Sequence, residues 1–129
     1  MTTRLLVVLI VLCALLPLRA FSGGDAFIAV AAEASDPGAQ VSAVAARAPY
    51  FLLFDENGVF LAAHANPYRE ARGAAGRQAA EWLAETGISL VAAGEFGSKM
   101  HAALESKGIK ALSLQGNAGE AVKQALAGQ

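Results

Sequence analysis

Residues 73–97 read GAAGRQAAEWLAETGISLVAAGEFG, and this stretch carries the signals of a helix, a turn and a strand in succession. From residue 74 the apolar side chains recur at helical spacing, and Gly87 marks the end of the helix because glycine readily adopts the backbone of a C-terminal cap. Residues 88–93 are mainly apolar and lie between glycines, which indicates a central strand. The predicted inner helix face is Ala75, Ala79, Trp82 and Leu83, and the outer face is Arg77, Glu81 and Glu85.

The same alternation continues toward the C-terminus. A second apolar stripe at helical spacing predicts a helix that ends at Gly108, followed by a last strand over residues 109–114. Asn117 and Glu120 have the spacing of a helix cap, so a third helix is expected to begin there. The predicted inner faces are Met100, Ala103 and Leu104 for the second helix, and Val122, Ala125 and Leu126 for the third.

Three strand-like segments precede the glycine-rich stretch, at residues 27–31, 50–54 and 59–64. Asn57-Gly58 is a strong hairpin signal, so the second and third strands should be antiparallel partners. Residues 39–47 are weakly patterned and are predicted to form a loop. A three-strand meander followed by α-β-α-β-α predicts an α/β fold, a five-stranded mixed sheet with helices packed on it.

Residues 1–20 have the character of a signal peptide or an N-terminal anchor. Arg4 precedes twelve uncharged, mostly apolar residues, whereas a membrane span needs roughly 20, so an export signal is favoured. Leu18 is larger than the small residue usually found three positions before a cleavage site, so an uncleaved form stays open. We therefore expect an exported protein, periplasmic or membrane-tethered, with its domain outside the cytoplasm and the membrane contacted only through this segment.

The remainder of the chain is expected to be a linker at residues 21–26 and one domain at residues 27–127. Without Arg4 and Arg19, eight basic residues remain against eleven acidic ones, a formal charge near −3. This balance disfavours nucleic-acid binding, which usually needs a basic excess. The single cysteine is Cys13, so the domain has no thiolate for a disulfide or for metal ligation, and a soft metal cluster must bring its own sulfur.

A family resemblance rests on residues 48–55, APYFLLFD, on the Asn66-Pro67 turn that follows, and on the glycine pairs at 73/76 and 94/97. This order resembles the dinitrogenase iron-molybdenum cofactor biosynthesis domain family, which contains nitrogenase cofactor carriers and related small metallocluster-binding proteins. The resemblance implies a ribonuclease H-like topology in which the second strand runs antiparallel to the rest. It also implies non-covalent binding of an anionic metal-sulfur cluster, of the iron-molybdenum type or another molybdenum or iron-sulfur type.

One motif departs from the family pattern. Before the second strand the family typically has Val-Ser, two or so residues, then His-Phe-Gly-Arg-Ala, and the resemblance implies that the histidine is a cluster ligand. Val41-Ser42 and Arg47-Ala48 match, but Val44, Ala45 and Ala46 stand in place of His-Phe-Gly. Valine has no lone pair for a metal, so another residue substitutes, the cluster is held without direct ligation, or binding has been lost.

The segment from Gly73 to Gly76 opens the predicted first helix, where free backbone N–H groups and the positive end of the dipole suit an anion. The resemblance places the bound cluster near this loop. The alternative is that small residues only let the helix approach the sheet closely. The predicted anion- or cluster-binding residues are Arg47, His64, Arg69, Arg72, Gly73, Gly76 and Arg77.

The two histidines, His64 and His101, are candidate metal ligands. His64 ends the third predicted strand beside the Asn66-Pro67 turn, and it is the candidate substitute ligand, with an exposed strand-end histidine as the alternative. His101 precedes Glu105 by four residues and could share a helix face with it. Two ligands without a third make a weak site, so a solvated helix face is the better interpretation of that pair.

The sequence lacks the motifs of several common enzyme classes. A ribonuclease H-type nuclease needs a carboxylate in the middle of its first strand, and residues 27–31 contain none. The chain has no Gly-x-Ser-x-Gly elbow and no Walker or dinucleotide fingerprint. We therefore predict a non-enzymatic, exported carrier of a small anionic metallocluster. The alternative is a protein-interaction module that kept the fold and lost the ligand.

Overall fold

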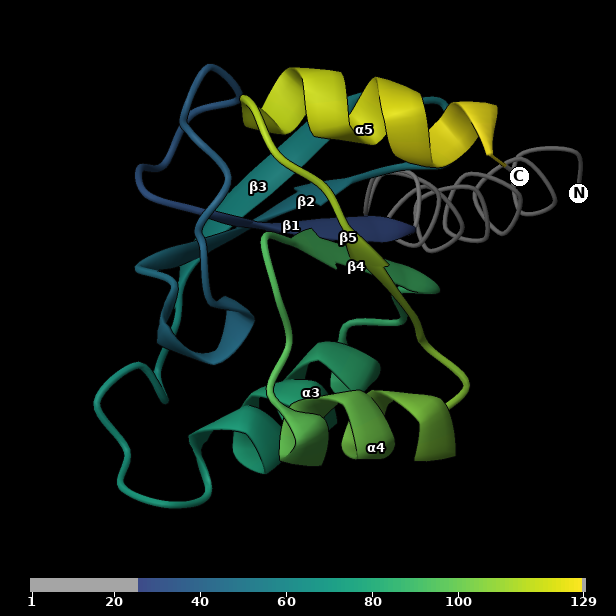
Figure 1. The fold of residues 1–129 in the computed structure, drawn as a ribbon. Helices are drawn as coiled ribbons and strands as arrows, with labels where there is room; N and C mark the ends of the chain where they lie inside the picture. The colour runs from purple at the N-terminus through teal and green to yellow at the C-terminus, as the bar shows by residue number, and fades with distance from the viewer. Residues whose placement is uncertain (1–25, 129) are drawn as a thin grey trace, which may run out of the picture.

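The computed structural model describes residues 26–128, which form a five-stranded sheet with the strand order β3-β2-β1-β4-β5 (Figure 1). The predicted meander followed by alternating helices and strands is confirmed. In chain order the elements are β1 (Ile28–Ala32), the 3₁₀ helix η1 (Ala45–Arg47), β2 (Tyr50–Phe54), β3 (Phe60–Ala65), α3 (Ala75–Glu85), β4 (Leu90–Ala93), α4 (Ser98–Ser106), β5 (Lys110–Ser113) and α5 (Ala118–Ala127).

Strand β2 runs against the other strands of the sheet. It pairs antiparallel with both β1 and β3, whereas β1 pairs parallel with β4, and β4 pairs parallel with β5. This confirms the strand directions that the resemblance implied. Consequently β1, β3, β4 and β5 all end at the same edge of the sheet.

Strand β1 lies at the centre, and all five of its residues are buried. Successive side chains point to opposite faces, so Ala29 and Ala31 join the core beneath α3 and α4, and Ile28 and Val30 join the core beneath α5. Figure 1 shows the resulting layers, with α3 and α4 on one face of the sheet and α5 on the other. A strand covered on both faces explains the continuous apolar run.

Residues 39–47 are more ordered than the predicted loop. Val44 bridges Glu95 in parallel, and the N–H groups of Gly94 and Glu95 donate to the carbonyls of Ser42 and Ala43 at 2.8 Å. This segment therefore extends the sheet beyond the end of β4, and η1 follows it. The partner lies about fifty residues away in the chain, so local pattern could not reveal the pairing.

Smaller corrections concern the ends of two strands. The predicted strands at residues 88–93 and 109–114 are each shorter, at Leu90–Ala93 and Lys110–Ser113. Leu126 faces inward on the third helix as predicted: it is partly buried against the core beneath α5 and also lies near Gly58 of the β2–β3 hairpin.

The predicted leader or anchor over residues 1–20, and all of the predicted linker except Ala26, lie outside the described residues. Across residues 26–128, every helix falls short of the length and apolar character that crossing a membrane requires.

Candidate functional site

Loops from distant parts of the chain gather at the edge where β1, β3 and β4 end. Residues 33–49 follow β1 and contain η1, residues 66–74 follow β3, and residues 94–97 follow β4. These loops lie on the left-hand side of Figure 1. Open α/β sheets bind their ligands outside the carboxyl ends of their parallel strands, so this edge is where a site is expected.

Helices α3 and α4 begin side by side at this edge and run in the same direction (Figure 1). Their cap residues, Ala74 and Gly97, make no side-chain capping hydrogen bond. Among the described residues, the backbone N–H groups of residues 75–77 and 98–100 have no hydrogen-bond acceptor. Two sets of free donors and two positive dipole ends therefore meet at one place.

Gly76 brings the two helix starts together. A Cβ atom at Gly76 would lie 2.8 Å from the Cβ atom of Met100 on α4, closer than real side chains allow. The alternative stated from the sequence, that small residues permit close packing, is therefore correct for Gly76. The element that Gly76 approaches, however, is α4 and not the sheet. Gly73 has a different requirement, since its φ of +78° lies in the left-handed region that other residues avoid.

A shallow hollow of about 270 Å³ lies between the two helix starts and η1. We call it the helix-start hollow. It brings together three of the predicted residues, Arg47, Gly73 and Gly76, and adds Lys99, whose side chain is exposed and forms no ion pair within residues 26–128. Its full lining is Val44, Ala46, Arg47, Gly73, Ala75, Gly76, Gly97, Ser98, Lys99 and Met100.

Arg47 fixes the wall of this hollow. Its guanidinium Nη1 donates to the carbonyls of Arg69 and Ala71, each at 2.8 Å, so it ties η1 to the loop that precedes α3. The same nitrogen cannot give those hydrogens to a ligand, although the positive charge remains. Arg47 therefore acts first as a clamp on the loop.

Asn66, which the sequence predicts only as part of a turn, is a second clamp. It is 7% exposed, and its Nδ2 donates to the carbonyls of Ala46 and Ala48 at 3.0 and 3.1 Å. Its Oδ1 accepts from the N–H of Tyr68 at 3.0 Å. The buried amide thus fastens the loop after β3 to η1 from the inside, and the Asn-Pro pair was the available signal.

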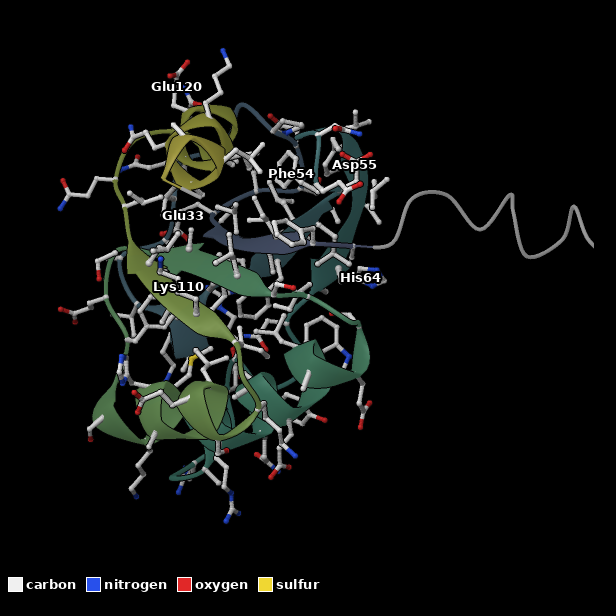
Figure 2. The ribbon with its side chains drawn as sticks, turned by 90° about the vertical axis from the view of Figure 1, so that its right-hand side faces the viewer. Glu33, Phe54, Asp55, His64, Lys110 and Glu120 are labelled. Carbon is white, nitrogen blue, oxygen red and sulfur yellow. The ribbon has the colours of Figure 1, made fainter. Side chains whose placement is uncertain are left out.

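His64 lies away from the helix-start hollow. It pairs with Phe51 across β3 and β2, and its ring stands edge-on to Trp82 with 5.9 Å between ring centroids. Trp82 follows Ala75 by seven residues on α3, about 10 Å at 1.5 Å per residue. Figure 2 shows His64 on the β3 side of the molecule, across the sheet from Lys110 on β5.

The three other predicted arginines, Arg69, Arg72 and Arg77, are exposed and form no ion pair within the described residues. Arg69 and Arg72 belong to the loop beside the helix-start hollow but do not line it, whereas Arg77 lines a neighbouring groove between α3 and α4. They place positive charge around the hollow rather than inside it.

Val44, which stands where the family pattern has histidine, lines the helix-start hollow and is 37% exposed. The side chain at this position therefore faces the space where a ligand would lie. Ser42, two residues earlier, is 3% exposed, and its Oγ has no hydrogen-bond partner in the part of the chain that the structure describes. The matching half of the motif thus keeps a buried, unsatisfied hydroxyl.

The groups that line the hollow decide which kind of ligand it can hold. Within residues 26–128, no three or more His, Cys, Asp or Glu side chains are placed to hold a metal ion together, and His101 with Glu105 remains an exposed pair without a third ligand. Backbone N–H groups, Lys99 and Arg47 are instead suited to negative charge. The hollow therefore suits an anion and does not suit a bare metal ion.

Comparison with known proteins agrees with this architecture. A family model described as dinitrogenase iron-molybdenum cofactor matches residues 27–128. The apo form of the orange protein from Desulfovibrio gigas is 30% identical, with a TM-score of 0.75 over 82% of this chain and 90% of that chain. A putative NifB protein from Thermotoga, assigned to the DUF35 family, is 25% identical, with a TM-score of 0.68 over 80% of this chain and 89% of that chain.

No curated protein matches the chain. The family model nevertheless spans nearly all of the described residues, including every element that forms the helix-start hollow. This chain belongs to the dinitrogenase iron-molybdenum cofactor family.

Proposed function

We propose that this protein binds an anionic metal-sulfur cluster in the helix-start hollow and carries it as cargo without transforming it. The cluster is of the iron-molybdenum type or another molybdenum or iron-sulfur type. The supporting observation is that two uncapped helix N-termini converge on one hollow in a member of this family. Free N–H groups and aligned dipoles stabilise a bound anion.

The cluster is held without bonds from the protein to its metals. Val44 has no lone pair, and His64 lies beside Trp82 outside the hollow. Backbone N–H groups of residues 75–77 and 98–100 donate to the sulfides instead, and Lys99 supplies charge. Because these charges are exposed, solvent and salt weaken the attraction, which suits cargo that must later be released.

The test is a titration of the full chain with tetrathiomolybdate, followed by amide NMR. We expect shifts concentrated at residues 73–77 and 97–100, and Lys99→Glu should weaken binding about tenfold because it reverses a charge beside the anion. Lys123→Glu on α5, on the other face of the sheet, is the matched control with the same change in net charge. Raising the salt concentration should weaken binding in the parent.

Two results would contradict the proposal. One is an absence of shifts at millimolar ligand, and the other is an equal loss of affinity in Lys99→Glu and Lys123→Glu. Circular dichroism of each variant confirms that the fold is intact before the comparison is made.

A second candidate function is a protein-interaction module that retains the fold without the cluster. It is favoured by Val44-Ala45-Ala46, which replaces the His-Phe-Gly of the family pattern at the wall of the hollow. Restoring the histidine with Val44→His separates the two functions. If the parent binds no thiomolybdate and Val44→His does, the replacement of histidine abolished cluster binding. The interaction-module function is then preferred to the carrier function.

We also propose that the protein is non-enzymatic and acts outside the cytoplasm, in the periplasm or tethered to the membrane. The support is the apolar segment after Arg4 and the absence from the sequence of the nucleophile and nucleotide motifs considered above. Fractionation of cells that express the tagged full chain tests the location. A full-length product in the cytoplasmic fraction would contradict export.

A further inference from the structure

A second hollow, which we call the α3–α4 groove, runs between the two helices on the exposed side of the molecule. Its volume is about 630 Å³. Its lining combines small residues with longer charged side chains. The lining is Gly73, Ala74, Ala102, Ala103 and Ser106, with Arg77, Glu81, Lys99 and Lys107.

The charge of this groove differs from that of the whole chain. Three cations, Arg77, Lys99 and Lys107, line it together with one carboxylate, Glu81. None of the three cations forms an ion pair within residues 26–128, whereas the full chain has a formal net charge of −1. A positive groove on an acidic protein attracts a negative partner and disfavours a positive one.

The spacing of the cations matches an extended chain. Lys99 near the start of α4 and Lys107 at its C-cap are eight residues apart, about 12 Å at 1.5 Å per residue. An extended segment covers that distance in about four residues at roughly 3.3 Å each. The alanine, glycine and serine residues in the lining have short side chains, which leave room for the backbone of a peptide.

We propose that the α3–α4 groove docks an extended acidic segment of another protein, with carboxylates about four residues apart. One carboxylate lies beside Lys99 and Arg77, and the other lies beside Lys107. The acidic peptide is preferred to nucleic acid because Glu81 interrupts the cations and the chain as a whole repels a polyphosphate. This docking does not require cluster binding, although Gly73 and Lys99 line both the groove and the helix-start hollow.

The test uses two eight-residue synthetic peptides of equal composition, one with two aspartates four positions apart and one with the aspartates adjacent. Each is titrated into the full chain at low salt and followed by amide NMR. We expect the spaced peptide to shift residues 99–107 and 77–81 and to bind more tightly than the adjacent one. Lys107→Glu should weaken the spaced peptide about three- to tenfold, as expected for reversal of one exposed charge.

The controls separate this docking from cluster binding. Lys107 does not line the helix-start hollow, so Lys107→Glu should leave tetrathiomolybdate binding unchanged. Lys107→Gln tests loss of charge without reversal, and Lys123→Glu matches the net charge on the opposite face. Equal affinity for both peptides, equal losses in Lys107→Glu and Lys123→Glu, or tighter binding of a DNA oligonucleotide of equal charge would each overturn the proposal.

Discussion

Helix α5 and the pair α3 and α4 begin at the same edge of the sheet on opposite faces, but their first N–H groups are treated differently (Figure 1). In α5, the N–H groups of Ala118 and Gly119 donate to the carbonyls of Ala39 and Pro37, and Glu120 N–H donates to Asn117 Oδ1. In α3 and α4, the N–H groups of residues 75–77 and 98–100 have no acceptor among the described residues.

This difference shows that loops at this edge can provide hydrogen-bond acceptors for the first N–H groups of a helix. Among the described residues they do so for α5, but not for α3 and α4 on the other face. The loop from β1 supplies the acceptors for α5, whereas η1 and the loop before α3 are tied to each other by Arg47. Open donors at α3 and α4 therefore arise from loop placement, and they leave one face available to an anion.

The largest expected contrast comes from two glycines at the second position of a helix, Gly76 in α3 and Gly119 in α5. Gly76→Ala should destabilise the protein by about 1–3 kcal/mol, because its methyl group would overlap Met100. In Gly119→Ala the nearest atoms lie at 3.5 Å, an ordinary contact, so the change should be neutral or stabilising. Urea unfolding of both variants measures the difference, and equal midpoints would show that α3 and α4 are not in close contact at their starts.

A smaller effect is expected from the cap of α5. Asn117→Ala should cost about 1 kcal/mol, because the N–H of Glu120 loses its side-chain acceptor. Ser98→Ala, one position after the cap residue of α4, is the control on the other face, and it should have almost no effect because α4 has no side-chain cap. Thermal melts compare the two variants, and a larger loss of stability in Ser98→Ala would contradict the difference between the starts of α4 and α5.

The smallest expected change in stability is an increase in the free energy of unfolding. Gly97 has extended backbone angles, and a Cβ atom there meets nothing within 4 Å, so another residue fits. Gly97→Asp should cap α4 and stabilise the protein by about 0.5 kcal/mol. The same carboxylate should weaken tetrathiomolybdate binding about tenfold by occupying the donors and repelling the anion.

Gly97→Asn is the control, since it offers a similar cap without charge. It should also stabilise but should weaken the anion less than Gly97→Asp does, in parallel melting and NMR titrations. Unchanged anion affinity in the aspartate variant would mean that the α4 N-terminus does not contribute to binding.

The helix and strand pattern could be predicted because it depends on local signals. Gly87 and Gly108 have φ values of +81° and +72° just beyond the ends of α3 and α4, and Asn117 caps α5 through Glu120 as expected. Each of these features joins residues only a few positions apart. The local Asn57-Gly58 signal also predicted the antiparallel pairing of β2 with β3, whereas the directions of the other strands came from the family resemblance.

Local signals predicted only part of the candidate site. Gly73 and Gly76 were identified because they open a helix, but Lys99 and the start of α4 were missed because their place beside α3 is a contact across more than twenty residues. A signal existed, since α4 begins after Gly97 without the Ser, Thr, Asp or Asn that usually caps a helix. His64 was placed near the loop by sequence distance, whereas pairing with Phe51 holds it against Trp82.

The parallel alignment of α3 and α4 has a consequence for the lifetime of the protein. Two like dipole ends held together by the Gly76–Met100 approach repel each other, and a bound anion relieves that repulsion. A ligand at a hundred times its Kd adds about 2.7 kcal/mol to the free energy of unfolding, which makes the unfolded chain roughly a hundredfold rarer. Proteases that attack the unfolded chain would then degrade protein without a bound anion faster than protein with one. Degradation would therefore enrich the anion-bound form.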